Sequence, residues 1–278
     1  MKTIFNRRRL QSFPAYPYVL WMALFVVIPI FLVLIYAFMN SDGQVTLENF
    51  SGMGSYTTVF IRSLWLAAIA TVVCLIIGYP VSYVLSKSGP VMQRIAMMLI
   101  MLPMWINFLL RTYSWMSLLE NTGLINRLLI FLGLPTINII NTQYAVLLGM
   151  VYNYLPFMIL PIYSVIVKID PSVIEAAQDL GANGLRIFLK ITFPLSMSGV
   201  ISGITMVFVP SVSTFIISRL LGGGTSILLG DLIEMQFLGS SYNPHLGSSI
   251  SLIMMVIVII CMSLMNRFGE GEEQAVML

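Results

Sequence analysis

The sequence predicts an all-α integral membrane protein, and three observations lead to this fold class. The chain of 278 residues is 58% hydrophobic and only 9% charged, with a mean hydropathy of +0.94. In soluble domains about a quarter of the residues are charged, so this composition excludes a soluble globular protein. Six apolar runs are long enough to cross a hydrocarbon core that needs roughly 20 residues of helix. These runs do not alternate between apolar and polar residues, which excludes an outer-membrane barrel.

The six predicted spans form a single transmembrane domain over residues 1–278. Their ranges are 18–39, 63–86, 92–117, 143–167, 192–217 and 247–266. The first run follows a basic N-terminus, but it contains Pro29 and leads to no small-residue cleavage site, so we interpret it as a retained span. Five spans contain proline, which removes a helix hydrogen bond and can place a bend where a transporter moves. The alternative is that proline is simply common in membrane helices.

The placement of lysine and arginine gives the orientation, because cytoplasmic segments of membrane proteins carry the excess of positive charge. With the N-terminus inside, the cytoplasmic segments hold Lys2, Arg7, Arg8, Arg9, Lys87, Arg94, Lys168, Arg186, Lys190 and Arg267. The outer side holds only Arg62, Arg111, Arg127 and Arg219. We therefore expect a multi-pass membrane protein with both termini and the loop 168–191 in the cytoplasm.

Several kinds of site are excluded by what the sequence lacks. His245 is the only histidine, and Cys74 and Cys261 fall within predicted spans, so a zinc site or a histidine-centred triad has almost nothing to be built from. The phosphate-binding pattern G-x-x-x-x-G-K-[ST] does not occur, so this chain is not expected to hydrolyse ATP itself. The net charge of +3 follows the positive-inside bias and does not argue for nucleic acid.

The polar segment between residues 168 and 195 interrupts an otherwise apolar chain, and it predicts a pair of cytoplasmic helices. Asp170 before Pro171 is a good helix start, because a carboxylate caps free N–H groups and proline fits the first helical position. An apolar stripe follows, and Gly181 is expected to end the helix in the left-handed conformation. The stripe consists of Val173, Ile174, Ala177 and Leu180. A second helix, beginning around Arg186, is expected to run past Pro194 into the fifth span.

The spacing within this segment carries a family resemblance. Glu175-Ala176-Ala177 is followed by Gly181 and then by Ile191-Thr192-Phe193-Pro194. This pattern resembles the cytoplasmic E-A-A-x3-G-x9-I-x-L-P loop of the permease subunits of bacterial ABC importers, with Phe193 in place of the leucine. Over its whole length the chain is most similar to the permeases of polyamine (spermidine/putrescine) importers, through its basic N-terminus, LPMWINFLLRTYSW and EAAQDLGANGLRIF. The alternative is an ordinary amphipathic loop helix.

The resemblance implies the fold and partners of a type I ABC importer permease, located in the bacterial inner membrane. It implies a heterodimer with a second, homologous permease, two copies of a cytoplasmic ATPase that bind ATP and Mg²⁺, and a periplasmic polyamine-binding protein. No cofactor is implied in this chain. In the family the glutamate and the glycine of the motif face the ATPase, and here they are Glu175 and Gly181. The expected coupling residues are Glu175, Ala176, Ala177, Gly181 and Arg186.

A cation path is predicted from polar and aromatic residues inside or near the spans. Aromatic faces attract organic cations, and acidic groups near an outer mouth would concentrate them. The candidates for the path are Trp105, Asn107, Tyr152, Asn153 and Tyr154, and the acidic candidates are Glu120, Asp231 and Glu234. The alternative for aromatic residues at span ends is that they anchor the protein at the membrane interface.

Two further functions stay open at this point. The first is a secondary carrier or channel for a small organic cation that works alone. It is disfavoured because no acidic residue lies near the middle of any span, where ion-coupled carriers commonly keep one. The second is a structural membrane subunit without a path of its own. A close helix contact is also expected at Gly199 and Gly203, with a partner helix either in this chain or in a second permease.

Overall fold

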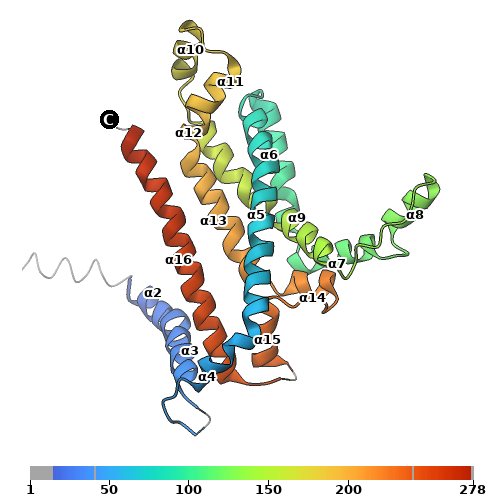
Figure 1. Ribbon diagram of the computed structural model, residues 1–278. Helices are drawn as coiled ribbons and strands as arrows, with labels where there is room; N and C mark the ends of the chain where they lie inside the picture. Colours follow the sequence, from blue (N-terminus) through green and yellow to red (C-terminus); the bar gives the residue numbers. More distant parts are fainter. Residues whose placement is uncertain (1–14, 41, 240, 277–278) are drawn as a thin grey trace, which may run out of the picture. The chain divides into compact units, whose positions relative to one another are not determined.

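The structure is a computed structural model that describes residues 15–40, 42–239 and 241–276. Lys2, Arg7, Arg8 and Arg9, which contributed to the predicted orientation, lie outside the described residues. Figure 1 shows that the described chain is built from helices, and its only β feature is an isolated bridge between Met39 and Val45.

Four of the described helices are long and apolar enough to cross a membrane, and the number rises to six if each of two bent helix pairs counts as one span. The four are Pro17–Phe38, Glu48–Ser86, Gln143–Ile166 and Pro244–Met265. The bent pairs are Pro90–Trp105 with Phe108–Phe131, which meet at 92°, and Gly184–Leu195 with Met197–Ser213, which meet at 62°. The structure therefore shows an all-helical membrane protein with four to six candidate spans.

The contacts divide the chain into two units, which we describe separately. The first unit comprises Met1–Tyr56 and Ile233–Val256, and the second comprises Thr57–Leu232 and Ile257–Leu278. The first unit contains α2 (Ala15–Met22), a π-helical turn (Ala23–Val27), α3 (Ile28–Phe38), α4 (Glu48–Ser51), a 3-10 turn (Gly52–Tyr56), the end of α15 (Leu229–Leu238) and the start of α16 (Pro244–Val276). The prediction of one domain over residues 1–278 stays a prediction.

Polar side chains close the C-terminal end of α3 in the first unit. Asn49 donates from Nδ2 to the carbonyl oxygens of Ala37 and Met39, at 3.1 and 2.9 Å. The hydroxyl of Ser249 donates to the same carbonyl of Ala37 at 3.1 Å. The last carbonyls of a helix have no partner within it, so these bonds satisfy groups that would otherwise be left unpaired. His245 contacts the same end of α3, through the carbonyl oxygen and the ring of Tyr36.

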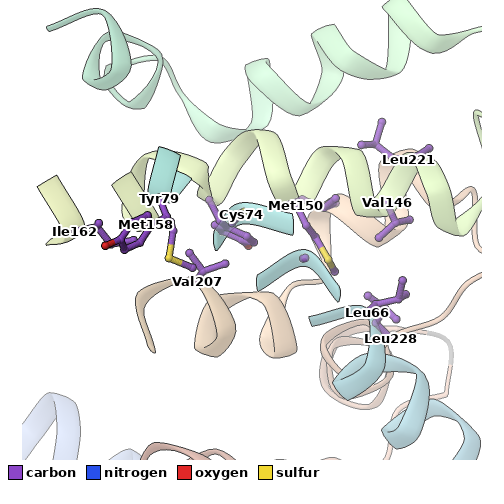
Figure 2. Packing of buried hydrophobic residues seen from close by; sticks show 14 of the residues in the cluster. Leu66, Cys74, Tyr79, Val146, Met150, Met158, Ile162, Val207, Leu221 and Leu228 are labelled. Carbon is purple, nitrogen blue, oxygen red and sulfur yellow. The ribbon is translucent and has the colours of Figure 1, made fainter. Parts of the chain in front are cut away.

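The core of the second unit is formed by three long helices that pack on one another, α5 (Thr57–Ser86), α9 (Gln143–Ile166) and α13 (Met197–Ser213). Figure 2 shows their buried side chains meeting between the helices, with Met150 and Met158 of α9 close to Cys74 of α5 and Val207 of α13. Cys74 is buried and free, as expected of a small core residue.

The small-residue face of α13 packs against α9 of the same chain. A Cβ atom at Gly199 would lie 2.9 Å from the carbonyl oxygen of Pro161, and one at Gly203 would lie 2.7 Å from the sulfur of Met158. Gly199 therefore allows the two helix backbones to approach closely, whereas a side chain at Gly203 would require the flexible side chain of Met158 to shift. The predicted contact is confirmed, and the partner helix belongs to this chain.

The third predicted span, 92–117, is divided into two helices. α6 (Pro90–Trp105) ends at Ile106, and α7 (Phe108–Leu119) begins in a new direction. Pro103 lacks the N–H that would continue the helix ladder, and the side chain of Asn107 accepts the N–H of Leu109 at 2.8 Å and so starts the second helix. The predicted third span is therefore present as a bent helix pair, with the break a few residues after Pro103.

The fifth predicted span, 192–217, is also divided. α12 (Phe193–Leu195) and α13 meet at Ser196, and α13 ends before Thr214, where α14 (Ile216–Gly222) follows in a separate direction. The hydroxyl of Ser196 donates to the carbonyl of Phe193 at 2.9 Å, which is a local bond that competes with a straight helix. The second span is longer than predicted, since α5 begins at Thr57, six residues before position 63.

The connection between α7 and α9 holds the short helix α8 (Leu124–Phe131), and Gly133, two residues after its end, has φ of +71°. Asn126 is buried there, because its amide donates to the carbonyls of Glu120 and Ile137 and accepts the N–H of Ile137 at 2.7 Å. The amide therefore ties the helix to both flanking loops.

Candidate coupling segment and solute path

The first cytoplasmic helix of the predicted pair is α10 (Pro171–Asp179), and both of its ends form as the sequence indicates. Asp170 accepts the N–H of Ser172 at 2.9 Å, and this N–H and the Ser172 hydroxyl hold the pKa of Asp170 below its usual value of 3.8. Gly181 has φ of +78°, and the N–H of Ala182 reaches back to the carbonyl of Ala177 at 3.0 Å. A left-handed residue with such a bond is a Schellman end, so the predicted cap is confirmed.

The second helix of the pair starts with α11 (Gly184–Ile187), which Asn183 caps by accepting the N–H of Arg186 at 2.9 Å. It continues through a π-helical turn, Phe188–Thr192, into α12. The chain then bends at Ser196 into α13, so the predicted continuity with the fifth span exists only as a bent helix pair.

The two faces of α10 have different surroundings. Pro171, Ile174, Glu175 and Gln178 recur at helical spacing and line a cavity of about 350 Å³ beneath the helix. The opposite face is open, and the side chain of Leu180 is 88% exposed. The predicted apolar stripe is thus split, because Ile174 faces the cavity while Val173 and Leu180 are exposed.

A cluster of four aromatic rings links the candidate coupling segment, residues 170–194, to α5. Phe188 contacts the ring of Tyr79 at a centroid distance of 5.7 Å and the ring of Tyr83 at 5.2 Å, both edge to face. Phe193 contacts Tyr79 at 5.6 Å, and the Tyr79 hydroxyl bonds the hydroxyl of Ser196 at 2.8 Å. Edge-to-face pairs are favourable beyond simple burial, so a displacement of Phe188 is resisted by α5. Phe193, which replaces the leucine of the motif, is part of this cluster.

The predicted path residues have different surroundings. Trp105 and Asn107 are exposed at the break between α6 and α7, with Trp105 at 86%. Tyr152 packs edge to face on Trp115 of α7 at 5.1 Å and is partly exposed. Asn153 and Tyr154 are buried, and the Tyr154 hydroxyl donates to the carbonyl of Pro210 at 3.4 Å. Of the three consecutive residues Tyr152, Asn153 and Tyr154, Tyr152 is therefore best placed to contact a solute.

Two buried polar groups near this region have no partner among the described residues. They are Oδ1 of Asn153 and the Nε and Nη1 nitrogens of Arg111, whose guanidinium lies 5.9 Å from the centre of the Phe108 ring. Buried polar groups are normally hydrogen-bonded, so unpaired ones mark places where a further polar group can bind.

The predicted acidic residues are not equivalent. Glu120 is exposed where α7 ends. Asp231 is only 7% exposed, and its Oδ2 accepts the N–H of Leu228 at 2.9 Å at the start of α15. Glu234 is partly exposed one turn later in α15. The side chain of Asp231 therefore has a structural role in capping the helix.

Sequence reasoning missed Lys87, Tyr79, Phe188 and Thr192 as parts of the coupling region. Tyr79 and Tyr83 lie four residues apart on α5, which places them on one face of the helix. That spacing was a usable signal for an aromatic contact. Nothing in the sequence shows which distant ring would meet it.

The sequence of this chain matches a known protein family. Residues 78–270 match the family described as the binding-protein-dependent transport system inner membrane component. The chain belongs to this family. It is an inner-membrane, multi-pass helical permease, and it is not itself the ATPase. The alternative of a carrier that works alone is thereby set aside.

Characterised relatives and solved structures agree with this assignment. The permease is 38% identical to the spermidine/putrescine transport system permease protein PotB of Haemophilus influenzae, over 91% of this chain and 94% of that protein. It is 36% identical to PotB of Escherichia coli K12, over 86% and 90% of the two chains. In fold it matches a chain of a bacterial ABC transporter involved in the import of alginate, with a TM-score of 0.84 at 14% identity over 96% and 97%. The MetNI methionine ABC transporter matches at 0.60 and 16%, over 79% and 97%.

Proposed function

We propose that this permease forms half of the translocation path of an ATP-driven spermidine/putrescine importer. The observation that carries the substrate class is the 38% identity to a spermidine/putrescine permease over nine-tenths of both chains. The aromatic side chains of Trp115 and Tyr152 support it, since aromatic faces attract organic cations.

The proposed assembly contains a second homologous permease, two ATPase subunits that bind ATP and Mg²⁺, and a periplasmic polyamine-binding protein. Six spans are proposed, with each bent helix pair counted as one span and both termini in the cytoplasm. The α5–α6 turn supports one common cytoplasmic face, because Lys87 lines the same cavity as Glu175 of α10.

In this proposal the segment from Asp170 to Pro194 transmits the ATPase cycle to the membrane helices. The exposed apolar side chains Val173 and Leu180 suit a partner groove, and exposed apolar groups on a helix flanked by polar ones are typical of an interaction site. The aromatic cluster around Phe188 then carries movement to α5. Glu175, Ala176, Ala177, Gly181 and Arg186 remain the proposed coupling residues.

Copurification tests the assembly. The permease is coexpressed with its ATPase, its partner permease and the binding protein, and is then extracted in mild detergent. A stoichiometric ATPase that is lost from a Leu180→Asp variant supports the proposal, with exposed Phe131→Asp as the matched control. The absence of ATPase from the parental complex would contradict it.

A further inference from the structure

The cavity beneath α10 contains more polar groups than the coupling role alone explains. It lies within the second unit and is about 350 Å³ in volume. The groups that matter are Tyr83 and Lys87 at the end of α5, Glu175 and Gln178 on α10, and Thr192. An ammonium group and a carboxylate thus face one partly enclosed space from two different elements.

Lys87, Glu175 and Gln178 are exposed to solvent, whereas the Thr192 hydroxyl is buried. The ammonium of Lys87 donates to the Tyr83 hydroxyl and lies 4.2 Å from the centre of the Tyr83 ring. The Thr192 side chain is 2% exposed, and its hydroxyl has no partner among the described residues. Glu175 forms no ion pair with any residue that the structure describes, although Lys87 lines the same cavity.

We propose that Lys87 is the intramolecular partner of Glu175, and that this pair forms when α10 moves onto the end of α5 and closes the cavity. The inference rests on the proposed function, since closure is taken to be a step of the coupling movement. Lys87 is then a positioning residue, which acts on transport through the placement of α10.

The chemistry of the cavity favours this pairing. A lysine ammonium has three donors on a flexible stem, so it can turn from Tyr83 toward a carboxylate. Opposite charges attract more strongly beside apolar walls such as Ile169 and Ile174 than in open water. Closure also brings the amide of Gln178 toward the buried hydroxyl of Thr192, which needs a partner.

The proposed ion pair between Lys87 and Glu175 would also affect the aromatic cluster through Tyr83. Tyr83, which holds Lys87 in this structure, is in edge-to-face contact with Phe188 of the same coupling segment. Release of Lys87 from Tyr83 therefore changes the surroundings of a ring that touches the second helix of the pair. Both helices of the coupling segment are thus joined to the end of α5.

Charge reversal in the assembled importer tests the proposal. Lys87→Glu and Glu175→Lys are each expected to lower uptake by up to about fivefold, the upper end of the effects measured for exposed ion pairs. The double variant Lys87→Glu/Glu175→Lys is expected to return to within about twofold of the parental uptake. Lys190→Glu is the matched control: Lys190 is exposed and outside the cavity, so this change should not rescue Glu175→Lys.

The outcomes separate this inference from the proposed function. A double variant no better than Glu175→Lys, with ATPase still copurifying, would overturn the pairing and leave the importer assignment intact. Loss of ATPase from the parental complex would instead contradict the importer assignment. If the reversed chains do not insert, a short thiol cross-linker is applied to Lys87→Cys/Glu175→Cys in a Cys74→Ala/Cys261→Ser background. Cross-linking no faster than in Lys87→Cys/Leu180→Cys would likewise overturn the pairing.

Discussion

The backbone angle of Gly181 determines where α10 ends and the chain reverses. Its φ of +78° is a conformation that residues with a side chain rarely adopt, whereas the space around a Cβ atom there is empty. A substitution therefore adds strain without a clash. An alanine in this conformation costs about 1 kcal/mol, while asparagine is tolerated better.

We expect uptake to be highest in the parent with Gly181 and to fall successively in Gly181→Asn, Gly181→Ala and Gly181→Asp. The abundance of the protein in the membrane should stay normal in all of them. Gly181→Asp adds both backbone strain and a charge at the end of α10 that we propose to face the ATPase, so it should uncouple transport most completely. Transport is measured by polyamine uptake, and membrane abundance by immunoblotting of isolated membranes. Parental uptake by Gly181→Asp would show that the left-handed turn has no part in coupling.

Tyr152 offers the test of the solute path. Tyr152→Leu removes the ring that packs on Trp115, so it should lower polyamine uptake several-fold while ATPase still copurifies. Tyr144→Leu, at the exposed start of the same helix, is the control. Unchanged uptake in Tyr152→Leu would return this ring to a packing role.

The residues that could be predicted from the sequence are those governed by local chemistry. Asp170 and Gly181 are specified by neighbours within a few positions, and both form the predicted caps. Thr192 and Lys87 gain their meaning only from a cavity between distant segments. No periodicity within one segment indicates such an arrangement.

At the scale of elements, the sequence predicts where apolar helices occur but not where they bend. The breaks near Asn107 and Ser196 depend on single side chains that bond to the backbone locally. Hydropathy averaged over a span does not detect such bonds. The proline positions were a partial signal, since Pro103 precedes the first break while Pro80 lies within the long helix α5.

The aromatic cluster joins two elements, so its loss should uncouple them. Phe188→Leu removes two edge-to-face contacts worth about 0.5–1.5 kcal/mol each. We expect ATP hydrolysis to continue with less polyamine taken up per ATP. Exposed Phe131→Leu is the control. An unchanged ratio of uptake to hydrolysis in Phe188→Leu would show that the cluster does not transmit movement.

The electrostatic field of the protein can be tested by neutralising the acidic residues Glu120 and Glu234, which are exposed and partly exposed. Exposed charges steer a cation over distance and are screened by salt. Glu120→Gln with Glu234→Gln should therefore lower uptake at low ionic strength and have little effect at moderate ionic strength. Asp231 is left unchanged, because its neutralisation would weaken the cap of α15. Equal uptake by parent and variant at both ionic strengths would refute steering by these groups.

We expect transport by this permease to be driven by ATP on a partner subunit. The most direct measurement is spermidine uptake into proteoliposomes that contain the complete complex and its binding protein, with ATP and Mg²⁺ supplied on the ATPase side. We predict uptake that requires ATP and falls sharply with Gly181→Asp. Uptake by the permease alone, under an ion gradient and without ATP, would contradict ATP-driven transport.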